Sequence, residues 1–313
     1  MSKKRLILHI GTHKTGTTTI QSTLFNLQHI LRKRGIVYPN ANLYSSSQKA
    51  HHFFAHAVAE AYQWHYLTAI NFISALKKDS NQIVLLSSEA IYRHTLNKNS
   101  RSYWKRRQAY IKRLSELVEE FDVELLIFFR RRDRFIESVY HERVYKGDTE
   151  TFYKTLEKKK PALDYGKQVS LLNSHFRLVK IYSYENAIKY GLINTFLNAI
   201  DCGDILHAED KHVWERISSD ARVTLWMAEK NRLDLKDLSK RQLFSKSKAI
   251  KKLFKDHGKL TLWPGNKLRS EFLSAYYDFN PISDNRTSVT YTDNERSLLD
   301  KAYQEYLRAC QDK

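Results

Sequence analysis

The chain has 313 residues, enough for one large domain or two small ones with a sizeable core. Hydrophobic residues make up 42% and aromatic residues 12%, which excludes a disordered polymer. With only 9 glycines and 4 prolines, the composition favours long helices over an all-β fold. The formal net charge of +19 indicates an anionic partner, although a basic surface can also serve solubility alone.

Two cysteines, Cys202 and Cys310, cannot build a disulfide framework or a cysteine-based zinc site. A reducing compartment, and so a cytoplasmic location, is the simpler expectation. Residues 1–5, which include Lys3, Lys4 and Arg5, precede an apolar run that is too short for a signal peptide. No run approaches the ~20 apolar residues that a spanning helix needs. We therefore expect no transmembrane segment, and peripheral contact with a membrane surface stays open.

The first predicted elements enclose a loop bounded by Gly11 and Gly16. An apolar run at residues 6–10 predicts a buried strand, and the apolar spacing along residues 17–33 predicts an amphipathic helix. Such a turn captures anions, because glycines let backbone N–H groups converge and the helix N-terminus adds partial positive charge. Lys14 adds a full charge inside the loop. Since two of only 9 glycines bracket it, a phosphate loop is favoured over an ordinary tight turn.

The next residues alternate between strand and helix patterns. Extended segments are predicted at 35–39, 82–87, 123–129 and 177–184. Helices are predicted at 51–76, around 111–118, and at 135–145, 163–176 and 186–200. Residues 40–49 predict a loop, the charged segment 150–160 predicts a surface, and Pro161 predicts a boundary. From residue 207 onward the sequence predicts helices and a basic segment at 241–259.

This alternation predicts an α/β fold: a P-loop-type parallel sheet flanked by helices, with a helical C-terminal region. We expect a single domain over residues 1–313, with an α/β core at 1–200 and a helical extension at 201–313 packed on it. Ligands of such sheets bind beyond the carboxyl ends of the strands. That rule brings three segments that follow strands to one site: 11–18, 87–89 and 130–134.

The loop differs from that of nucleotide triphosphatases, in which lysine directly follows the second glycine and a hydroxyl holds magnesium. Here Thr17 and Thr18 follow Gly16, and Lys14 lies inside the loop. The pattern Gly11-x-x-Lys14-x-Gly16-Thr17-Thr18 resembles the 5′-phosphosulfate-binding loop of sulfotransferases that use 3′-phosphoadenosine 5′-phosphosulfate. The resemblance assigns binding of this co-substrate to Gly11, Thr12, His13, Lys14, Thr15, Gly16, Thr17 and Thr18.

A second motif of these enzymes binds the donor's 3′-phosphate through an arginine at a strand end and a serine eight residues later. Arg130 follows the predicted strand at 123–129, and Ser138 has the required spacing. Arginine offers a planar, permanently charged fork that a serine hydroxyl can complete. A basic run can also be a solvated face or a nucleic-acid patch, but its position after a buried strand favours phosphate. The sequence around Arg130 resembles that of bacterial sulfotransferases. The resemblance assigns no role to Arg131, Arg132 and Arg134.

The resemblance covers roughly residues 1–200 and implies metal-free transfer of a sulfuryl group to a hydroxyl or amine. In-line transfer needs neutralised charge on the leaving oxygen, a task that suits Lys14. Glu89 is the candidate general base, and its alternative role is to cap the following helix. His51 and His52 are rival bases, because a histidine near its ordinary pKa could do the same work.

Basic residues after Glu89 alternate with aromatic residues that can stack on sugar rings. They are Arg93, Lys98, Arg101, Lys105, Arg106 and Arg107, with Tyr92, Tyr103 and Trp104. A solvated helix face explains them equally well. Because carbohydrate-modifying members of the family use such a region, we expect the acceptor to be a bacterial surface glycan or another hydroxyl-bearing molecule. This acceptor could carry acidic groups. The candidate acceptor-binding residues are His51, His52 and Arg93.

Two other functions stay open. A P-loop kinase or phosphotransferase would need magnesium and an acidic residue after a strand, such as Glu89, but the position of Lys14 argues against it. A nucleic-acid-binding protein would explain the net charge and leave the paired motifs unexplained. The sequence has no zinc spacing and no recognisable nucleic-acid-binding motif. We therefore expect neither a metal nor a nucleic-acid partner.

Overall fold

The computed structural model of the chain describes residues 3–42, 49–96, 100–205, 224 and 227–228. Their contacts divide them into two compact units, each of which is described by itself. The first contains residues 3–131 and 164–205, and the second contains 132–163, 224 and 227–228. Predictions for the chain beyond residue 207, including the basic segment at 241–259, lie outside these residues.

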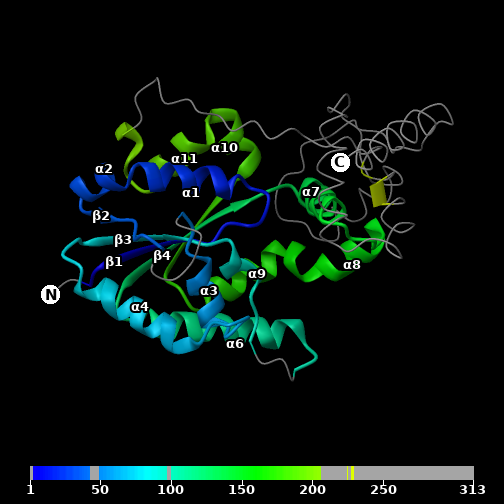
Figure 1. Ribbon diagram of the computed structural model, residues 1–313, viewed down its shortest axis with the longest axis horizontal. Helices are drawn as coiled ribbons and strands as arrows, with labels where there is room; N and C mark the ends of the chain where they lie inside the picture. Colours follow the sequence, from blue (N-terminus) through cyan, green and yellow to red (C-terminus); the bar gives the residue numbers. More distant parts are fainter. Residues whose placement is uncertain (1–2, 43–48, 97–99, 206–223, 225–226, 229–313) are drawn as a thin grey trace, which may run out of the picture. The chain divides into compact units, whose positions relative to one another are not determined.

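The first unit is built on a five-stranded sheet in which all paired strands are parallel. Its strands are β1 (Arg5–His9), β2 (Ile36–Val37), β3 (Ile83–Ser87), β4 (Asp122–Phe129) and β5 (Leu178–Ser183). Across the sheet they follow the order β2-β3-β1-β4-β5 (Figure 1). The predicted α/β fold with a parallel sheet is confirmed.

Helices cover both faces of this sheet (Figure 1). One face carries α1 (Thr17–Asn26), α2 (Gln28–Lys33), α10 (Tyr184–Tyr190) and α11 (Leu192–Ala199). The other carries α3 (His52–Val58), α4 (Tyr66–Lys78), α6 (Tyr103–Leu117) and α9 (Tyr165–Asn173). The short helix α5 (Ala90–Arg93) follows β3, and a 3-10 turn, Gly203–Ile205, follows α11.

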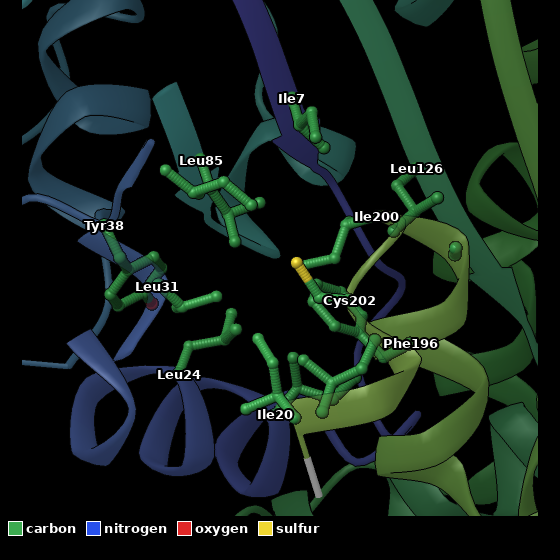
Figure 2. Close-up of a cluster of buried hydrophobic side chains, with 14 of the residues drawn as sticks. Ile7, Ile20, Leu24, Leu31, Tyr38, Leu85, Leu126, Phe196, Ile200 and Cys202 are labelled. Carbon is green, nitrogen blue, oxygen red and sulfur yellow. The ribbon is translucent and has the colours of Figure 1, made fainter. Parts of the chain in front are cut away.

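Apolar packing fixes α1 above the middle of the sheet (Figure 2). Ile20 and Leu24 of α1 and Phe196 of α11 lie in one buried cluster with Ile7 and Leu126 of the sheet. Each of these side chains is at most 1% exposed, and burying one contributes about 1.5–3 kcal/mol. This packing holds the N-terminus of α1, and the loop before it, at the carboxyl end of β1.

Three predicted helices are each broken in two: 17–33, 51–76 and 186–200. Leu27 separates α1 from α2, residues 59–65 separate α3 from α4, and Gly191 separates α10 from α11. Gly191 has a φ of +91°, a conformation that glycine adopts without strain. The apolar spacing did not reveal the breaks, because both halves of each helix pack on the same face of the sheet.

The described part of the second unit contains α7 (Arg132–Tyr145) and α8 (Phe152–Leu163). The first begins three residues before the helix predicted at 135–145. Most of the segment predicted as charged surface is helical, and Pro161 lies inside α8 rather than at a boundary. Close to a helix end, the missing N–H of proline removes only one internal hydrogen bond.

The contact division differs from the predicted one. It assigns residues 132–163 to the second unit, whereas the predicted core extended over 1–200. A single domain over 1–313 therefore stays a prediction. In the part of the chain that the structure describes, no helix has the length and apolar character needed to cross a membrane.

Candidate active site

Threonine hydroxyls hold the shape of the loop between β1 and α1. Thr12 Oγ1 donates a hydrogen bond to the carbonyl of Phe128 at 3.1 Å, and Thr15 Oγ1 donates to the carbonyl of Thr12 at 2.6 Å. The backbone N–H of Ile10 bonds to Leu126 at 3.0 Å. Both threonines are fully buried. The hydroxyl of Thr12 therefore fixes the loop against β4, and that of Thr15 fixes the turn within the loop.

The loop has a conformation suited to an anion. Lys14 and Gly16 have φ values of +69° and +70°, whereas Thr15 between them has no positive φ. Alternation of this kind turns backbone N–H groups toward one concave side. Packing is also close at Gly16: a Cβ there would lie 2.3 Å from Cδ2 of Leu192, so that this leucine side chain would have to move. For Lys14 the left-handed conformation costs about 1–2 kcal/mol, strain of the kind that gathers at functional sites.

Arg130 follows β4 directly and reaches this loop. Its Nη1 donates to the carbonyl of Lys14 at 3.1 Å, and its guanidinium lies 5.4 Å from the ring centroid of Tyr184. The Tyr165 hydroxyl donates to the carbonyl of Arg130 at 2.8 Å. Among the described residues, no carboxylate contacts the guanidinium and its buried Nε has no hydrogen-bond partner. An arginine that is fixed in position and has no carboxylate partner can bind an anion.

The sheet topology explains why Arg130 meets the loop. The chain leaves β1 toward β2 on one side of the sheet and leaves β4 toward β5 on the other. This is the switch point at which open parallel sheets bind ligands. The last residue of β1, His9, pairs with Leu126, and β4 continues to Phe129. At about 3.3 Å per residue, β4 extends about 10 Å further and carries Arg130 past the end of β1.

Glu89, at the carboxyl end of β3, turns its carboxylate toward the loop. Its Oε1 lies 3.0 Å from Nδ1 of His13, and its Oε2 accepts a hydrogen bond from Oγ1 of Thr17. Although Glu89 directly precedes α5, its side chain makes no capping hydrogen bond. The helix-capping alternative therefore does not describe this carboxylate. Its role as a base stays a prediction.

The surroundings of Glu89 keep it ionised. Burial favours the neutral acid, but the hydrogen bonds from His13 and Thr17, together with the charges of His13 and His52, outweigh burial and lower the pKa to about 2. At neutral pH this residue is therefore a carboxylate. An acid of such low pKa is a weak proton acceptor by itself, which makes its contact with His13 chemically important.

His51, proposed from the sequence as a rival base and acceptor-binding residue, has structural partners at both ring nitrogens. The N–H of Ser87 donates to its Nδ1 at 3.1 Å, so the ring hydrogen is on Nε2, which donates to the carbonyl of Pro39 at 2.8 Å. The side chain is fully buried, and this burial lowers its pKa to about 4. No nitrogen of His51 is available to a substrate.

His52 and Arg93 lie on the β3 side of the site. His52 is half-buried, and its Nδ1 is 3.1 Å from Oγ of Ser88. Burial lowers the pKa of His52, the charge of Glu89 raises it, and the charge of Arg93 lowers it again. Arg93 is exposed at the end of α5. Both residues stay candidates for acceptor binding.

One of the basic residues predicted to hold an acceptor has a structural role instead. Arg107 is fully buried, and its Nη1 donates to the carbonyls of Ile91 and His94 at 2.7 and 2.9 Å. It therefore satisfies carbonyls at the end of α5, which have no partner inside that helix. Lys98 lies outside the described residues. Two others are exposed, Arg101 and Lys105.

The serine of the predicted 3′-phosphate motif belongs to the second unit. Ser138 is half-buried in α7, and its assignment to the donor site rests on the sequence alone. Two unassigned arginines of the same run have contacts inside this unit. Arg132 is buried and donates from Nε to the carbonyl of Leu163 at 2.8 Å, and Arg134 lies 3.5 Å from Glu137.

Sequence reasoning missed two contacts of the site. The sequence assigned His13 to co-substrate binding but did not predict its contact with Glu89, and it did not predict the contact between Arg130 and Tyr184. Both contacts follow from the order of the strands in the sheet, which the sequence alone does not show. His13 and Glu89 follow the adjacent strands β1 and β3, and Tyr184 directly follows β5, the neighbour of β4.

Among the described residues, no group of three or more His, Cys, Asp or Glu side chains is arranged to hold a metal ion. His56 and His94 form a pair in which Nδ1 of the first lies 2.6 Å from Nε2 of the second. Burial lowers their pKa values to about 4 and about 3, so that both rings are neutral at pH 7. The expected independence from metal stays a prediction.

Comparisons with known proteins give little. No family model matches the chain, and no curated protein matches it. Among solved structures, a sulfotransferase from Alicyclobacillus acidocaldarius is similar, with a TM-score of 0.42 and 13% identity. That match covers 79% of this chain and 94% of the other. At these values the match supports no argument about activity.

Proposed function

We propose that this protein is a sulfotransferase, which transfers a sulfuryl group from 3′-phosphoadenosine 5′-phosphosulfate to a hydroxyl or amine of an acceptor. The observation that carries the proposal is the position of Arg130. It bonds to the carbonyl of Lys14 across the switch point and has no carboxylate partner among the described residues. An anion loop with an arginine beside it suits a donor that has phosphate groups at two places.

The loop and Arg130 take different parts of the donor. The N-terminus of α1 and the N–H groups of the loop suit the 5′-phosphosulfate, because both present partial positive charge. Lys14 neutralises the charge that develops on the leaving phosphate oxygen. Arg130 donates charge-assisted hydrogen bonds to the 3′-phosphate. Glu89, which contacts the loop from the β3 side, belongs to removal of the acceptor's proton.

For the acceptor we propose a carbohydrate, such as a glycan of a bacterial surface, bound beyond the end of β3. The exposed Arg93, Arg101 and Lys105 support an acceptor that carries acidic groups. The Trp104 ring has one face covered, since Nζ of Lys167 lies 4.7 Å from its centroid. At most the other face of this ring is left to stack on a sugar.

Thermal unfolding with three ligands tests the proposal. Wild-type protein is heated with 3′-phosphoadenosine 5′-phosphate in EDTA, with ATP and magnesium, or with an unrelated oligonucleotide. A ligand at a hundredfold excess over its Kd stabilises the folded state by about 2.7 kcal/mol and raises the Tm. We expect this rise with the bisphosphate.

The other two ligands represent the alternative functions. A rise with ATP and magnesium but not with the bisphosphate would indicate a kinase or phosphotransferase. A rise with the oligonucleotide alone would indicate a nucleic-acid-binding protein. Either result overturns the proposal, because the bisphosphate is the product that a sulfotransferase must release from its donor site.

A further inference from the structure

A histidine and a carboxylate form a pair at the candidate site. Nδ1 of His13 lies 3.0 Å from Oε1 of Glu89, while Thr17 Oγ1 donates to the other carboxylate oxygen. The side chains of His13 and Glu89 are 30% and 20% exposed. Both oxygens of Glu89 are thus engaged, and the pair stays open to small solutes.

The contact sets the tautomer of the histidine. An ionised carboxylate can only accept hydrogen bonds, so the hydrogen of a neutral His13 ring lies on Nδ1. Nε2 then keeps its lone pair. Among the described residues, His13 has no hydrogen-bond or ion-pair partner other than Glu89. Its Nε2 is therefore left to accept a proton, as in catalytic triads, where a carboxylate fixes the ring from the other nitrogen.

The pair and the donor-binding arginine approach the loop from different strands. Arg130 follows β4, whereas Glu89 follows β3, and β1 lies between these two strands. In-line transfer requires the attacking and leaving oxygens to lie on opposite sides of sulfur. The leaving oxygen belongs to the 5′-phosphate proposed to lie in the loop, and the 3′-phosphate is proposed to lie at Arg130 on the β4 side. The β3 side, where Glu89 lies, is thus left for the acceptor.

We propose that Nε2 of His13 is the general base of the transfer and that Glu89 is a positioning residue that holds this ring. This inference rests on the proposed sulfotransferase function. The sequence assigned His13 only to co-substrate binding, and this inference adds a role in proton transfer.

The proposed step balances in atoms and charge. The acceptor oxygen forms a bond to sulfur as its proton passes to Nε2 of His13. The bond between sulfur and the phosphate oxygen breaks, and its electron pair leaves with 3′-phosphoadenosine 5′-phosphate. Glu89 faces the resulting imidazolium and stabilises it. His13 returns its proton to water after the products leave.

Other groups near the pair are less suited to the task. Both nitrogens of His51 are occupied. Nδ1 of His52 meets the hydroxyl of Ser88 rather than a carboxylate, and burial lowers the pKa of His52, which makes its ring a weaker proton acceptor. Direct transfer to Glu89 is less favourable, because its contacts with His13 and Thr17 lower its pKa to about 2 and make it a weak proton acceptor.

His13→Ala tests the base directly. Turnover is measured with radiolabelled donor and a polysaccharide extract of the host cell, with and without added imidazole. We expect turnover to fall at least about a hundredfold, the usual contribution of a general base, and to recover in part with imidazole. His29→Ala, on the exposed face of α2, is the matched control and keeps wild-type turnover. Wild-type turnover in His13→Ala, or a loss that imidazole leaves unchanged, overturns the proposal.

The positioning role of Glu89 has a spectroscopic signature. In protein with nitrogen-labelled histidine, two-bond nitrogen–proton spectra report the tautomer of each neutral ring, and the signals of His13 are those missing in His13→Asn. We expect the Nδ1–H form in wild type and loss of this fixed form in Glu89→Ala. An Nε2–H form in wild type, or an unchanged tautomer in Glu89→Ala, contradicts the assignment.

Donor affinity separates this inference from the proposed function. Calorimetry with 3′-phosphoadenosine 5′-phosphate should give similar Kd values for wild type and His13→Asn, within about threefold, because a base on the acceptor side contributes little to product binding. If wild type does not bind the bisphosphate, the proposed function fails. If wild type binds it and His13→Asn does not, His13 is a donor-binding residue and only the present inference fails.

Discussion

Gly16 joins the loop to the packing of the helices. Its φ is +70°, and a Cβ at this position would lie 2.3 Å from Leu192. Gly35 is a natural control, because its φ is +74° but a Cβ there would meet nothing within 4 Å. Gly35→Ala should therefore lose only the left-handed conformational preference, about 1–2 kcal/mol. Gly16→Ala should lose more free energy of unfolding, measured in urea, because Leu192 must also move.

The double variant Gly16→Ala/Leu192→Ala checks the cause. Removing the leucine side chain removes the clash, so the double variant should be more stable than the sum of the two single losses implies. Additive losses would show that contact with Leu192 does not limit position 16. Equal losses for Gly16→Ala and Gly35→Ala would show the same.

At this scale the sequence predicted positions better than contacts. It placed the loop, Glu89 and Arg130 after strands, and they lie there, because strand ends can be read from apolar runs. It did not predict that His13 meets Glu89, since that contact depends on the pairing of β1 with β3. It also treated His51 as a possible base, because burial and ring partners do not show in residue type.

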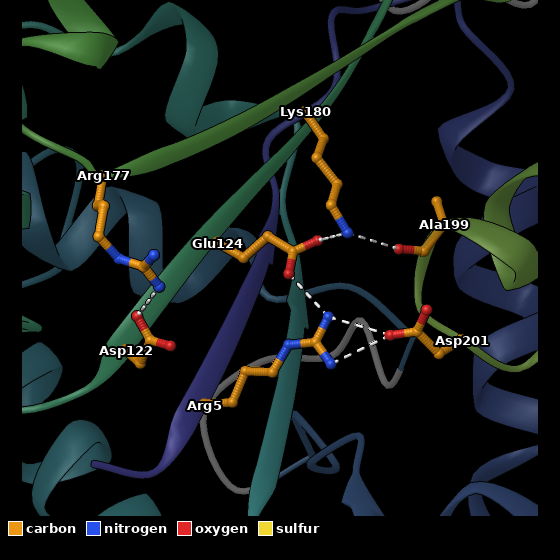
Figure 3. Close-up of polar contacts among 7 residues, drawn as sticks. All are labelled: Arg5, Asp122, Glu124, Arg177, Lys180, Ala199 and Asp201. Atoms are coloured by element: carbon orange, nitrogen blue, oxygen red, sulfur yellow. Dashed lines mark hydrogen bonds and ion pairs between the residues drawn. The ribbon is translucent and has the colours of Figure 1, made fainter. Parts of the chain in front are cut away.

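An ion-pair cluster toward the amino ends of the strands joins β1, β4 and β5 (Figure 3). Glu124 of β4 is only 4% exposed and lies 2.7 Å from Arg5 and 2.6 Å from Lys180. Arg5 also contacts Asp201 at 3.2 Å. One carboxylate thus neutralises cations from both neighbouring strands.

Glu124→Ala should lower the free energy of unfolding by about 3 kcal/mol, because it leaves two partly buried cations without their shared partner. Asp122→Ala, in the same strand, is the control. Asp122 pairs with Arg177 at 2.8 Å, but both side chains are well exposed, so its loss should cost less than about 1 kcal/mol. Urea unfolding of the two variants makes the comparison. Equal losses would contradict the dependence on burial.

The element boundaries that the sequence missed have a common physical origin. The breaks at Leu27 and Gly191 interrupt hydrogen bonding without interrupting the apolar face, so periodicity passes through them. Pro161 was read as a boundary, yet it is inside α8, where helix contacts outweigh one lost hydrogen bond. The strands were located more closely, because runs of buried apolar residues with polar ends are local signals.

Across the whole molecule, buried neutral histidines make stability depend on pH. His9 and His51 are fully buried, and burial lowers both pKa values to about 4. In the unfolded chain a histidine has a pKa of about 6.5. Below that pH the unfolded state binds protons that the folded state does not, so stability falls between about pH 6.5 and pH 4.

Each of these two histidines should reduce the free energy of unfolding by about 2 kcal/mol between pH 7 and pH 5. His56 and His94, whose pKa values burial also lowers, act in the same direction, and urea unfolding at the two pH values measures the total. Acids with lowered pKa values change the stability only at lower pH. The pKa of Glu89 is about 2, so its contribution to stability is lost only below about pH 4. Equal stability at pH 7 and pH 5 would show that these rings are not held neutral in the folded state.

The net charge of +19 pointed to an anionic partner without choosing among nucleotide, glycan and nucleic acid. That choice depends on whether Arg130 and the loop bind one bisphosphorylated ligand. Arg177 is a matched control for Arg130. It lies at the amino end of β5, whereas Arg130 lies at the carboxyl end of β4, and it pairs with Asp122 on the surface. Its removal tests charge alone.

The most direct measurement is a calorimetric titration of 3′-phosphoadenosine 5′-phosphate, in EDTA, into wild type, Arg130→Ala and Arg177→Ala. A charge-assisted hydrogen bond contributes about 1.5–3 kcal/mol, so Arg130→Ala should weaken binding by about 10- to 100-fold. Arg177→Ala should bind as wild type does. Undetectable binding to wild type, or equal affinity of wild type and Arg130→Ala, would contradict a donor site at the junction of the loop and β4.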